Sequence, residues 1–240
     1  MNENLALKDN VIEDGDRSLS STFASDVYAF TIDQAYTDTS ASGADYLDIS
    51  LFTEQGRTLK SRLYYTSGTA KGHSITYPVR DKATGKATGE EKYLPSFTLC
   101  NDIYQLINGY GLAGMKTEEK VVKCWDSAAK KELPQKKQVC MDLKGKKIAL
   151  AVLEQIVMKQ VNKDGNWVDS KETRKNNEVV KAFNAETAQT ATEIKNDAEA
   201  AWIDGWLAKY KGEVMDTTSS GTKTASGAKA TGEKKKLDFS

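Results

Sequence analysis

The chain of 240 residues has few of the side chains that usually build metal centres, with one histidine and three cysteines. The histidine, His73, has no second histidine beside it. Cys100, Cys124 and Cys140 form no Cys-x-x-Cys pair. Zinc sites need three or four such ligands at close spacing. An odd number of scattered cysteines also argues against a disulfide framework and indicates a reducing, cytosolic compartment. We therefore expect no metal and no cofactor.

Long apolar runs are also lacking. The longest, Ile148–Met158, is interrupted by Glu154 and Gln155 and is too short to span a bilayer. The first ten residues are polar and partly acidic and do not resemble a secretory signal. We expect a protein without a membrane partner.

Familiar catalytic motifs are missing too. The sequence contains neither a G-x-x-x-x-G-K-[ST] phosphate loop nor a G-x-S-x-G nucleophile turn. Asp45 and Asp48 could act as the carboxylate pair of a metal-dependent nuclease, but acidic residues on an open strand face are commonplace. We predict that the protein is not an enzyme. The nuclease alternative predicts DNA cleavage with magnesium or manganese.

The formal net charge is zero, but the charges are unevenly distributed. Between Arg57 and Lys92 there are eight Lys or Arg residues against three Asp or Glu, and between Lys120 and Lys147 there are nine against three. The acidic residues lie mostly before Asp16 and after Asp164. This distribution can give a neutral molecule one basic face, which is typical of proteins that bind polyanions. Solvated lysine-rich loops would give the same pattern.

Alternating apolar residues predict three consecutive strands, Asp26–Ala35, Asp45–Phe52 and Thr58–Thr66. In the second and third strands, leucine and isoleucine side chains occupy one face. The other face carries cations and aromatic rings. Turn residues separate the strands at Thr37–Ala44 and at Gly56.

Beyond these strands the pattern changes several times. Ser67–Glu91 is expected to be a long, flexible, basic loop, and a helix is expected from Pro95 to Asn108. Further strands are predicted at Glu119–Trp125, Lys146–Val161 and Glu178–Phe183. The pattern of Lys146–Val161 alone would also allow a helix, and an Asp164-Gly165 turn follows it. A second helix is predicted at Thr192–Tyr210.

This order predicts a mainly β fold with helices (α+β), namely an OB-fold five-stranded barrel with a capping helix, a C-terminal helix and a flexible tail. A β-sandwich with helices is the alternative. The predicted organisation is an N-terminal arm (1–24), an OB-fold domain with insertions (25–211) and a disordered tail (212–240), whose composition cannot build a core.

Rings beside cations suggest a surface for single-stranded nucleic acid, because rings stack on bases and Lys or Arg follows the phosphates. Such contacts need no base-edge hydrogen bonds and tolerate any sequence. Any one ring could instead pack into the core. The residues expected to contact DNA are Tyr46, Phe52, Arg57, Lys60, Arg62, Tyr64, Lys71, His73, Tyr77, Arg80 and Lys92.

Several stretches between Asp26 and Lys211 resemble bacteriophage single-stranded DNA-binding proteins of the OB-fold type. They are Val27–Tyr36, Ala44–Leu51, Gly56–Lys60, Tyr65–Gly72, Lys92–Phe97, Met115–Lys120 and Thr190–Ile194. None of these strings is a catalytic signature.

The resemblance implies a replication or recombination accessory protein that coats and protects exposed single strands in the cytoplasm of an infected bacterium. Proteins of this class often end in an acidic tail with a terminal phenylalanine that recruits replication enzymes. Asp238 and Phe239 match that tip, whereas Lys234, Lys235 and Lys236 replace the acidic run. The alternative function is a recombination mediator or protein-interaction module without a DNA-coating role. The oligomeric state is left open.

Overall fold

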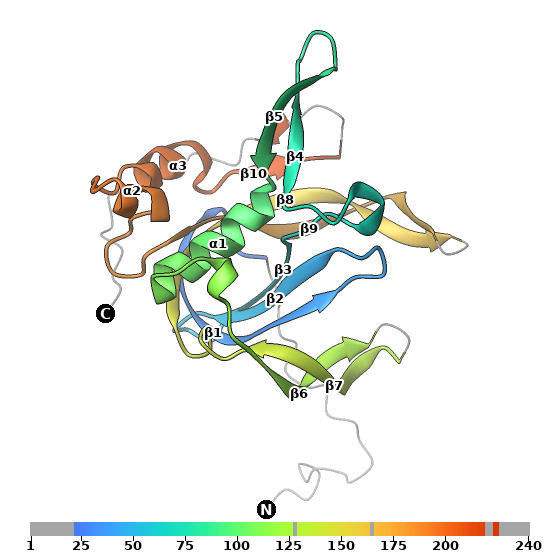
Figure 1. The fold of residues 1–240 in the computed structure, drawn as a ribbon, viewed down its shortest axis with the longest axis horizontal. Coiled ribbons are helices and arrows are strands. Elements are labelled where there is room, and N and C mark those ends of the chain that lie inside the picture. Colours follow the sequence, from blue (N-terminus) through green and yellow to red (C-terminus); the bar gives the residue numbers. More distant parts are fainter. Residues whose placement is uncertain (1–21, 127–128, 164–165, 219–222, 226–240) are drawn as a thin grey trace, which may run out of the picture.

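The computed structural model describes residues 22–126, 129–163, 166–218 and 223–225 (Figure 1). Half of the chain is strand, and the sheets are mostly antiparallel. The prediction of a mainly β fold with helices is therefore confirmed. The predicted Asp164-Gly165 turn lies outside the described residues. The strands of the main body are β1 (Asp26–Thr39), β2 (Asp45–Phe52), β3 (Thr58–Tyr64), β6 (Thr117–Asp126), β7 (Lys131–Cys140), β8 (Lys147–Lys163) and β9 (Asn166–Phe183).

Strands β1, β2 and β3 form the antiparallel meander expected from their alternation. The apolar residues of β2 and β3 face the interior: Leu47, Ile49 and Leu51 are buried, as are Leu59 and Leu63. The register pairs Leu47 with Leu63 and Tyr46 with Tyr64, so the ring-bearing side chains share the opposite face. The predicted assignment of the two faces is confirmed.

Strand β8 accounts for the apolar run at residues 148–158. Leu150 and Val152 enter the main core with β1–β3, while Ala149 and Ala151 pack on the other side against helix α3 (Trp202–Tyr210). A strand buried on both faces has no reason to alternate apolar and polar residues. Its first half pairs with the first half of β1.

Helix α1 (Pro95–Asn108) begins and ends as predicted, with proline in its first turn and Gly109 in the left-handed region after its end. Its buried side chains include Leu99, Cys100 and Ile103, which complete the main core. The helix contacts both β3 and β9. Strand β3 pairs only with β2, and β9 pairs only with β8, so the described pairings do not close into a barrel. Helix α1 covers the opening between the two strands.

The segment expected to be a long flexible loop, Ser67–Glu91, is instead structured. It holds a 3-10 turn, η2 (Thr69–Lys71), and a projecting hairpin of β4 (Thr76–Arg80) and β5 (Ala87–Tyr93), shown at the top of Figure 1. Few side chains of this hairpin are buried, so its sequence carries no apolar alternation from which strands could be recognised. The backbone pairing between the strands defines it.

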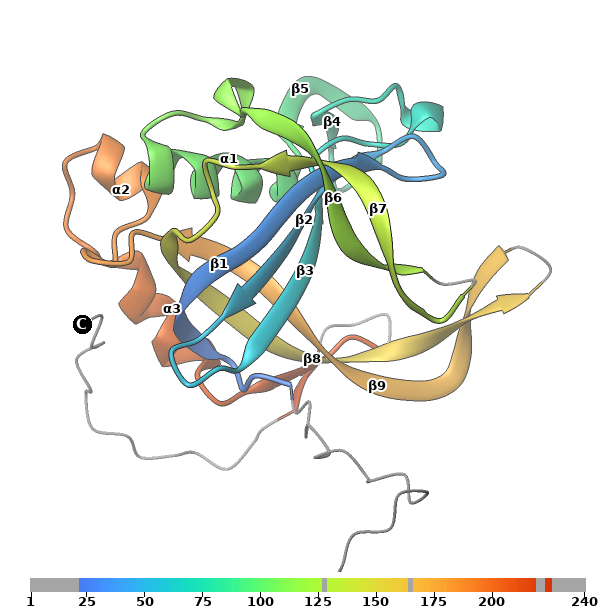
Figure 2. The same ribbon diagram turned by 90° about the horizontal axis from the view of Figure 1, so that it is seen from below.

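Two long hairpins extend from the body, β6–β7 and β8–β9 (Figure 2). The sequence predicted only part of each, because their ends reach beyond the core and lose the apolar pattern. A second 3-10 turn, η3 (Leu112–Gly114), connects α1 to β6. The single C-terminal helix that was predicted is in fact two, α2 (Ala191–Lys195) and α3. Asp197 has a left-handed backbone between them, and the Glu193 carboxylate accepts hydrogen bonds from the first N–H groups of α3.

Both ends of the described chain are tied to the body. The side chain of Asn177 on β9 makes two hydrogen bonds to the backbone of Phe23, at 2.8 and 2.7 Å, and the Phe23 ring is buried in the core. Within the segment predicted to be a disordered tail, β10 (Val214–Asp216) pairs in parallel with β8, and β11 (Lys223–Ala225) pairs with β10. Met215 packs beside α3, which gives this strand an apolar anchor.

All three cysteines are buried and unpaired with one another. Burial raises the pKa of Cys100 far above its ordinary value and raises the pKa of Cys140 to about 11. Both thiols therefore remain protonated at neutral pH. No helix in the described ranges is long and apolar enough to cross a membrane.

Candidate nucleic-acid interface

One side of β1, β2 and β3, opposite the core, carries five of the residues expected to contact DNA: Tyr46, Phe52, Lys60, Arg62 and Tyr64. We call this surface the outer face; its residues alternate with the core leucines and isoleucines. Tyr46, Asp48, Ser50 and Phe52 on β2 stand opposite Tyr64, Arg62, Lys60 and Thr58 on β3. Tyr36 and Asp38 of β1 extend the row, because they pair with Asp48 and Tyr46.

Arg62 is the centre of the outer face. Its guanidinium donates two hydrogen bonds to Asp48, from Nε to Oδ1 at 3.0 Å and from an Nη to Oδ2 at 2.6 Å. It also lies over the ring of Tyr46, 4.1 Å from the centroid. The paired Asp48 raises the pKa of Arg62 further above its ordinary value. Bidentate pairing and ring contact fix the guanidinium, yet 46% of its side chain remains exposed.

The two tyrosines of the β2–β3 pair have different environments. Tyr46 is only 6% exposed, and its hydroxyl donates to Asp38 at 3.2 Å. Burial raises the pKa of Tyr46 to about 12. The expectation of a free stacking ring at Tyr46 is wrong, because Arg62 and Tyr64 cover it. Tyr64 lies edge-on to Tyr46, with the centroids 5.5 Å apart, and is 41% exposed. The accessible ring of this pair is therefore Tyr64.

The β6–β7 hairpin reaches over part of the outer face. Its Glu132 carboxylate lies 3.3 Å from the Lys60 ammonium of β3, and both side chains are largely exposed, at 47% and 73%. Nearer the base, Lys137 pairs with Asp38 of β1 and lies 5.9 Å from the ring centroid of Tyr36. Lys60 and Arg62 thus both have carboxylate partners within the chain, and DNA phosphates would have to compete with them.

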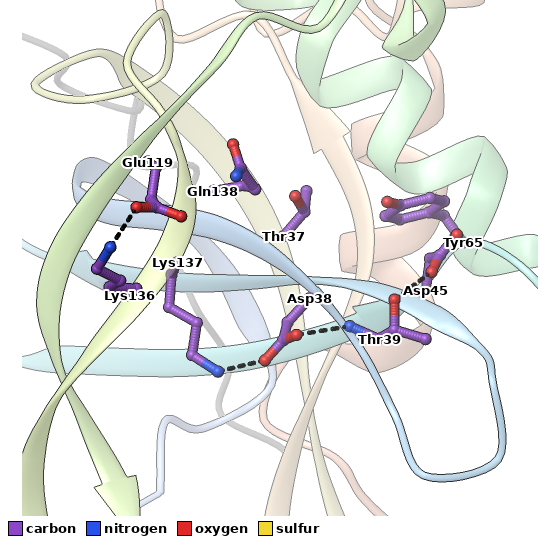
Figure 3. A pocket seen from close by; sticks show the side chains of 9 residues that line it. All are labelled: Thr37, Asp38, Thr39, Asp45, Tyr65, Glu119, Lys136, Lys137 and Gln138. Atoms are coloured by element: carbon purple, nitrogen blue, oxygen red, sulfur yellow. Dashed lines mark hydrogen bonds and ion pairs between the residues drawn. The ribbon is translucent and has the colours of Figure 1, made fainter.

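A small pocket of about 300 Å³ lies where β7 meets the β1–β2 turn (Figure 3). Lys137 and Lys136 line it, but each is paired with a carboxylate, Asp38 and Glu119. Thr39 donates a hydrogen bond to Asp45 at 2.7 Å. The lining therefore carries three carboxylates, of Asp38, Asp45 and Glu119, against two ammonium groups, which makes the pocket a poor anion site.

A larger groove of about 510 Å³ runs between the unpaired edges of β3 and β9. We call it the β3–β9 groove. Residues 60–63 of β3 form one wall and residues 176–180 of β9 form the other. Its remaining lining residues are Pro95, Ser96 and Leu99 of α1 and Gln155 of β8.

Of the residues predicted to contact DNA, Tyr77, Arg80 and Lys92 lie on the β4–β5 hairpin and Lys71 lies in η2. Tyr77 and Lys92 are direct cross-strand partners, which places an exposed ring beside an exposed cation. Arg80 instead donates to the carbonyl oxygen of Gly85 at 3.0 Å and stabilises the hairpin turn. Lys71 is exposed in η2, at the base of this segment.

His73 is held within the chain. Its Nδ1 lies 2.8 Å from the carbonyl oxygen of Gly43, and its Nε2 lies 3.0 Å from Asp45 Oδ2. Both ring nitrogens therefore already have partners, and the contact fixes η2 against the β1–β2 turn. A direct DNA contact by His73 would require these bonds to break.

Asp45 and Asp48 point to opposite faces of β2, since they are three positions apart along an extended strand. Asp45 contacts Thr39 and His73, whereas Asp48 contacts Arg62 and Tyr36. Across the described ranges, no three His, Cys, Asp or Glu side chains gather in a way that could hold a metal ion.

Two other predicted residues lie at the far end of the β2–β3 pair. Phe52 is partly exposed on the outer face. Arg57 lies over the ring of Phe23, 4.0 Å from its centroid, and so helps to seal the core. Asp238 and Phe239, the expected partner-binding tip, lie outside the described residues.

Tyr93 and Trp125 are the most exposed rings in the described part of the chain, and neither was among the residues listed as expected DNA contacts. Tyr93, at the end of β5, stacks on Phe97 with centroids 5.1 Å apart and planes at 28°. Trp125 on β6 stands opposite Glu132 and is strongly exposed. Alternation in Glu119–Trp125 could have suggested an outward Trp125, next to Lys123. The sequence signal for Tyr93 is its place directly after Lys92, at the end of the basic segment, where a ring again stands beside a cation.

Comparisons of the chain with protein-family models, with curated proteins and with solved structures found no match.

Proposed function

We propose that this chain is a sequence-independent single-stranded DNA-binding protein. The observation that carries the proposal is the outer face of the β2–β3 hairpin, where the exposed ring of Tyr64 adjoins the exposed cations Lys60 and Arg62. Single strands offer base faces for stacking and phosphates for ion pairing, and this surface offers both complements. Binding would be sequence-tolerant because neither contact reads a base edge.

The same proposal covers the finer fold. We propose an OB-type architecture in which β1, β2, β3, β7 and β8 form an incomplete five-stranded barrel, with α1 as its cap. Three features support it: the β1–β2–β3 meander, the helix that follows, and the return of β8 and β7 to the same edge of β1.

The proposed mechanism combines phosphate neutralisation with stacking. Lys60 and Arg62 must exchange carboxylate partners for phosphates, so part of the gain on binding offsets the loss of those ion pairs. Lys71 of η2 and Lys92 of β5 make no ion pair with the described residues and need no such exchange. Affinity should fall steeply as salt rises, because each phosphate contact releases counterions.

A titration of a labelled oligothymidylate at increasing salt tests this mechanism, and an unchanged affinity would refute it. Tyr64→Ala should weaken binding more than Tyr28→Ala when both variants are equally folded. Tyr28 is half-buried against the core, and its hydroxyl donates to the carbonyl oxygen of Ala24. Equal losses for the two variants would remove the assignment of Tyr64 to the binding surface.

The resemblance to phage proteins extends the proposal to the protein's setting. We propose a role in coating strands during phage replication or recombination, in the cytoplasm of the infected host, without catalysis and without a cofactor. Recruitment of replication proteins through Asp238 and Phe239 is part of the proposal. A pull-down with and without the last residues would test that recruitment.

One observation favours the second candidate, a recombination mediator or protein-interaction module. The cations of the outer face are paired with Asp48 and Glu132, which lowers the positive field that a polyanion would meet. Competition between single-stranded DNA, duplex DNA and RNA at fixed ionic strength separates the candidates. An interaction module would show no preference for single strands.

A further inference from the structure

We infer that the DNA strand binds along the β3–β9 groove, and that a base stacks on Tyr93 at the α1 end of this groove. This inference rests on the proposed function and adds a path and a contact residue to it. The groove runs along the outer edge of β3, where Lys60 and Arg62 belong both to the outer face and to the groove wall.

The groove is built mainly of polar side chains with fixed positions. Gln155 donates a hydrogen bond to Glu178, and Asn177 is held by the backbone of Phe23. The side chains of Asn176 and Ser96 have no hydrogen-bond partner among the described residues and are available to a ligand. An amide- and hydroxyl-lined groove suits the sugar and phosphate groups of a nucleic-acid chain, whereas an apolar peptide segment would find few pockets in it.

Cations flank this groove on both walls. Lys60 and Arg62 lie on β3, and Arg174 lies on β9 two residues beyond Asn176, on the same face of the strand. Arg174 is exposed and makes no hydrogen bond or ion pair with the described part of the chain. A phosphate could therefore pair with Arg174 at this end of the groove without first breaking an ion pair within the described part of the chain.

Tyr93 is the best-prepared ring near the groove. Its residue is 59% exposed, although one side of the ring rests on Phe97, which itself packs against the main core. The anchored ring leaves its other side to solvent and loses little freedom when a base stacks on it. Tyr93 precedes Pro95, a groove residue, by two positions, so its Cα lies within about 7 Å of the groove lining.

The test compares Tyr93→Ala with Tyr93→Phe and with Trp125→Ala in titrations of a labelled oligothymidylate. Removing one stacking ring should weaken binding about 5- to 150-fold. Tyr93→Phe should bind like the unmodified protein, because stacking does not need the hydroxyl. Trp125→Ala should have a smaller effect, since Trp125 on β6 is exposed but is not one of the residues that line the groove. Thermal unfolding of each variant shows whether the loss of the Phe97 contact has disturbed the fold.

Photocrosslinking provides a second measurement that does not depend on a variant. With a bromouracil-substituted strand, the crosslinked peptide should contain Tyr93. The inference is overturned if Tyr93→Ala binds as tightly as the unmodified protein, if Trp125→Ala weakens binding equally, or if the crosslinks map elsewhere. Failure of the unmodified protein to bind any single strand would instead refute the proposed function itself.

Discussion

Glu132→Gln should tighten binding to single-stranded DNA. Glu132 reaches from the β6–β7 hairpin to Lys60 on the outer face, with 3.3 Å between the ammonium and the carboxylate. If Lys60 contacts a phosphate, this ion pair must open first. The substitution removes the internal competitor and retains a side chain of nearly the same size. The proposed mechanism thus predicts a gain of affinity from the loss of an ion pair.

The size of the gain follows from the exposure of the pair. Both side chains are largely exposed, at 73% for Lys60 and 47% for Glu132. Exposed ion pairs are typically worth about 0.2–1 kcal/mol. The variant should therefore bind about 1.4- to 5-fold more tightly at low salt, since 1.4 kcal/mol corresponds to a factor of ten. The gain should shrink as salt screens the charges.

Fluorescence anisotropy with a labelled oligothymidylate measures this difference. Removing any acidic side chain raises the net charge by one, so a matched control is needed. Glu186→Gln makes the same charge change at an exposed position just before α2, without an ion pair. Lys60→Gln should bind more weakly than the unmodified protein. The reasoning is refuted if Glu132→Gln gains no more than Glu186→Gln, or if it binds more weakly.

Two further predictions concern stability. Lys181→Met should lower the free energy of urea unfolding by about 3–5 kcal/mol, because the buried Asp102 carboxylate of α1 loses the ammonium that lies 2.6 Å from it. Lys159→Met is the control. It breaks an exposed ion pair with Glu172 on the β8–β9 hairpin and should cost less than about 1 kcal/mol. Similar losses in the two variants would contradict this. Although burial raises the pKa of Glu193, hydrogen bonds from Thr190, Trp202 and Ala201 outweigh it and lower the pKa from 4.5 to about 2. The ionised Glu193 carboxylate therefore stabilises the fold above about pH 4.5, and this contribution is lost as pH falls toward 2. In Glu193→Gln the melting temperature should depend less on pH across that window. A dependence as steep as that of the unmodified protein would count against this role.

The sequence predicted those elements whose side chains face a core on one side. Leu47, Ile49 and Leu51 alternate with other side chains because β2 has one face in the core and one face outside it. The helical spacing of the apolar residues in α1 reflects a single buried face. The β4–β5 hairpin has no core to face, so nothing in its side chains reveals its strands. The division between α2 and α3 depends on the carboxylate of Glu193 meeting N–H groups eight and nine residues later, which helical spacing cannot reveal.

The candidate site shows the same limit. Alternation placed Tyr46, Arg62 and Tyr64 on one face, as the register confirms. Alternation did not show that Arg62 would lie over Tyr46 and bury it. That contact depends on the hydrogen bond from Arg62 to Asp48, which fixes the position of the guanidinium. The pairing of Lys60 with Glu132 joins residues 72 positions apart. Contacts of this kind arise from the path of the β6–β7 hairpin, which local sequence does not determine.

The burial of Cys100, Cys124 and Cys140 has a practical consequence for spectroscopy. Maleimides and iodoacetamides attack thiolates at solvent-accessible sulfur, so the native cysteines should stay unlabelled while the fold is intact. A cysteine introduced at an exposed position such as Lys92 or Arg174 would then carry a dye alone. Paired dyes on the protein and on an oligonucleotide could trace the route of the strand in solution without first removing any natural cysteine.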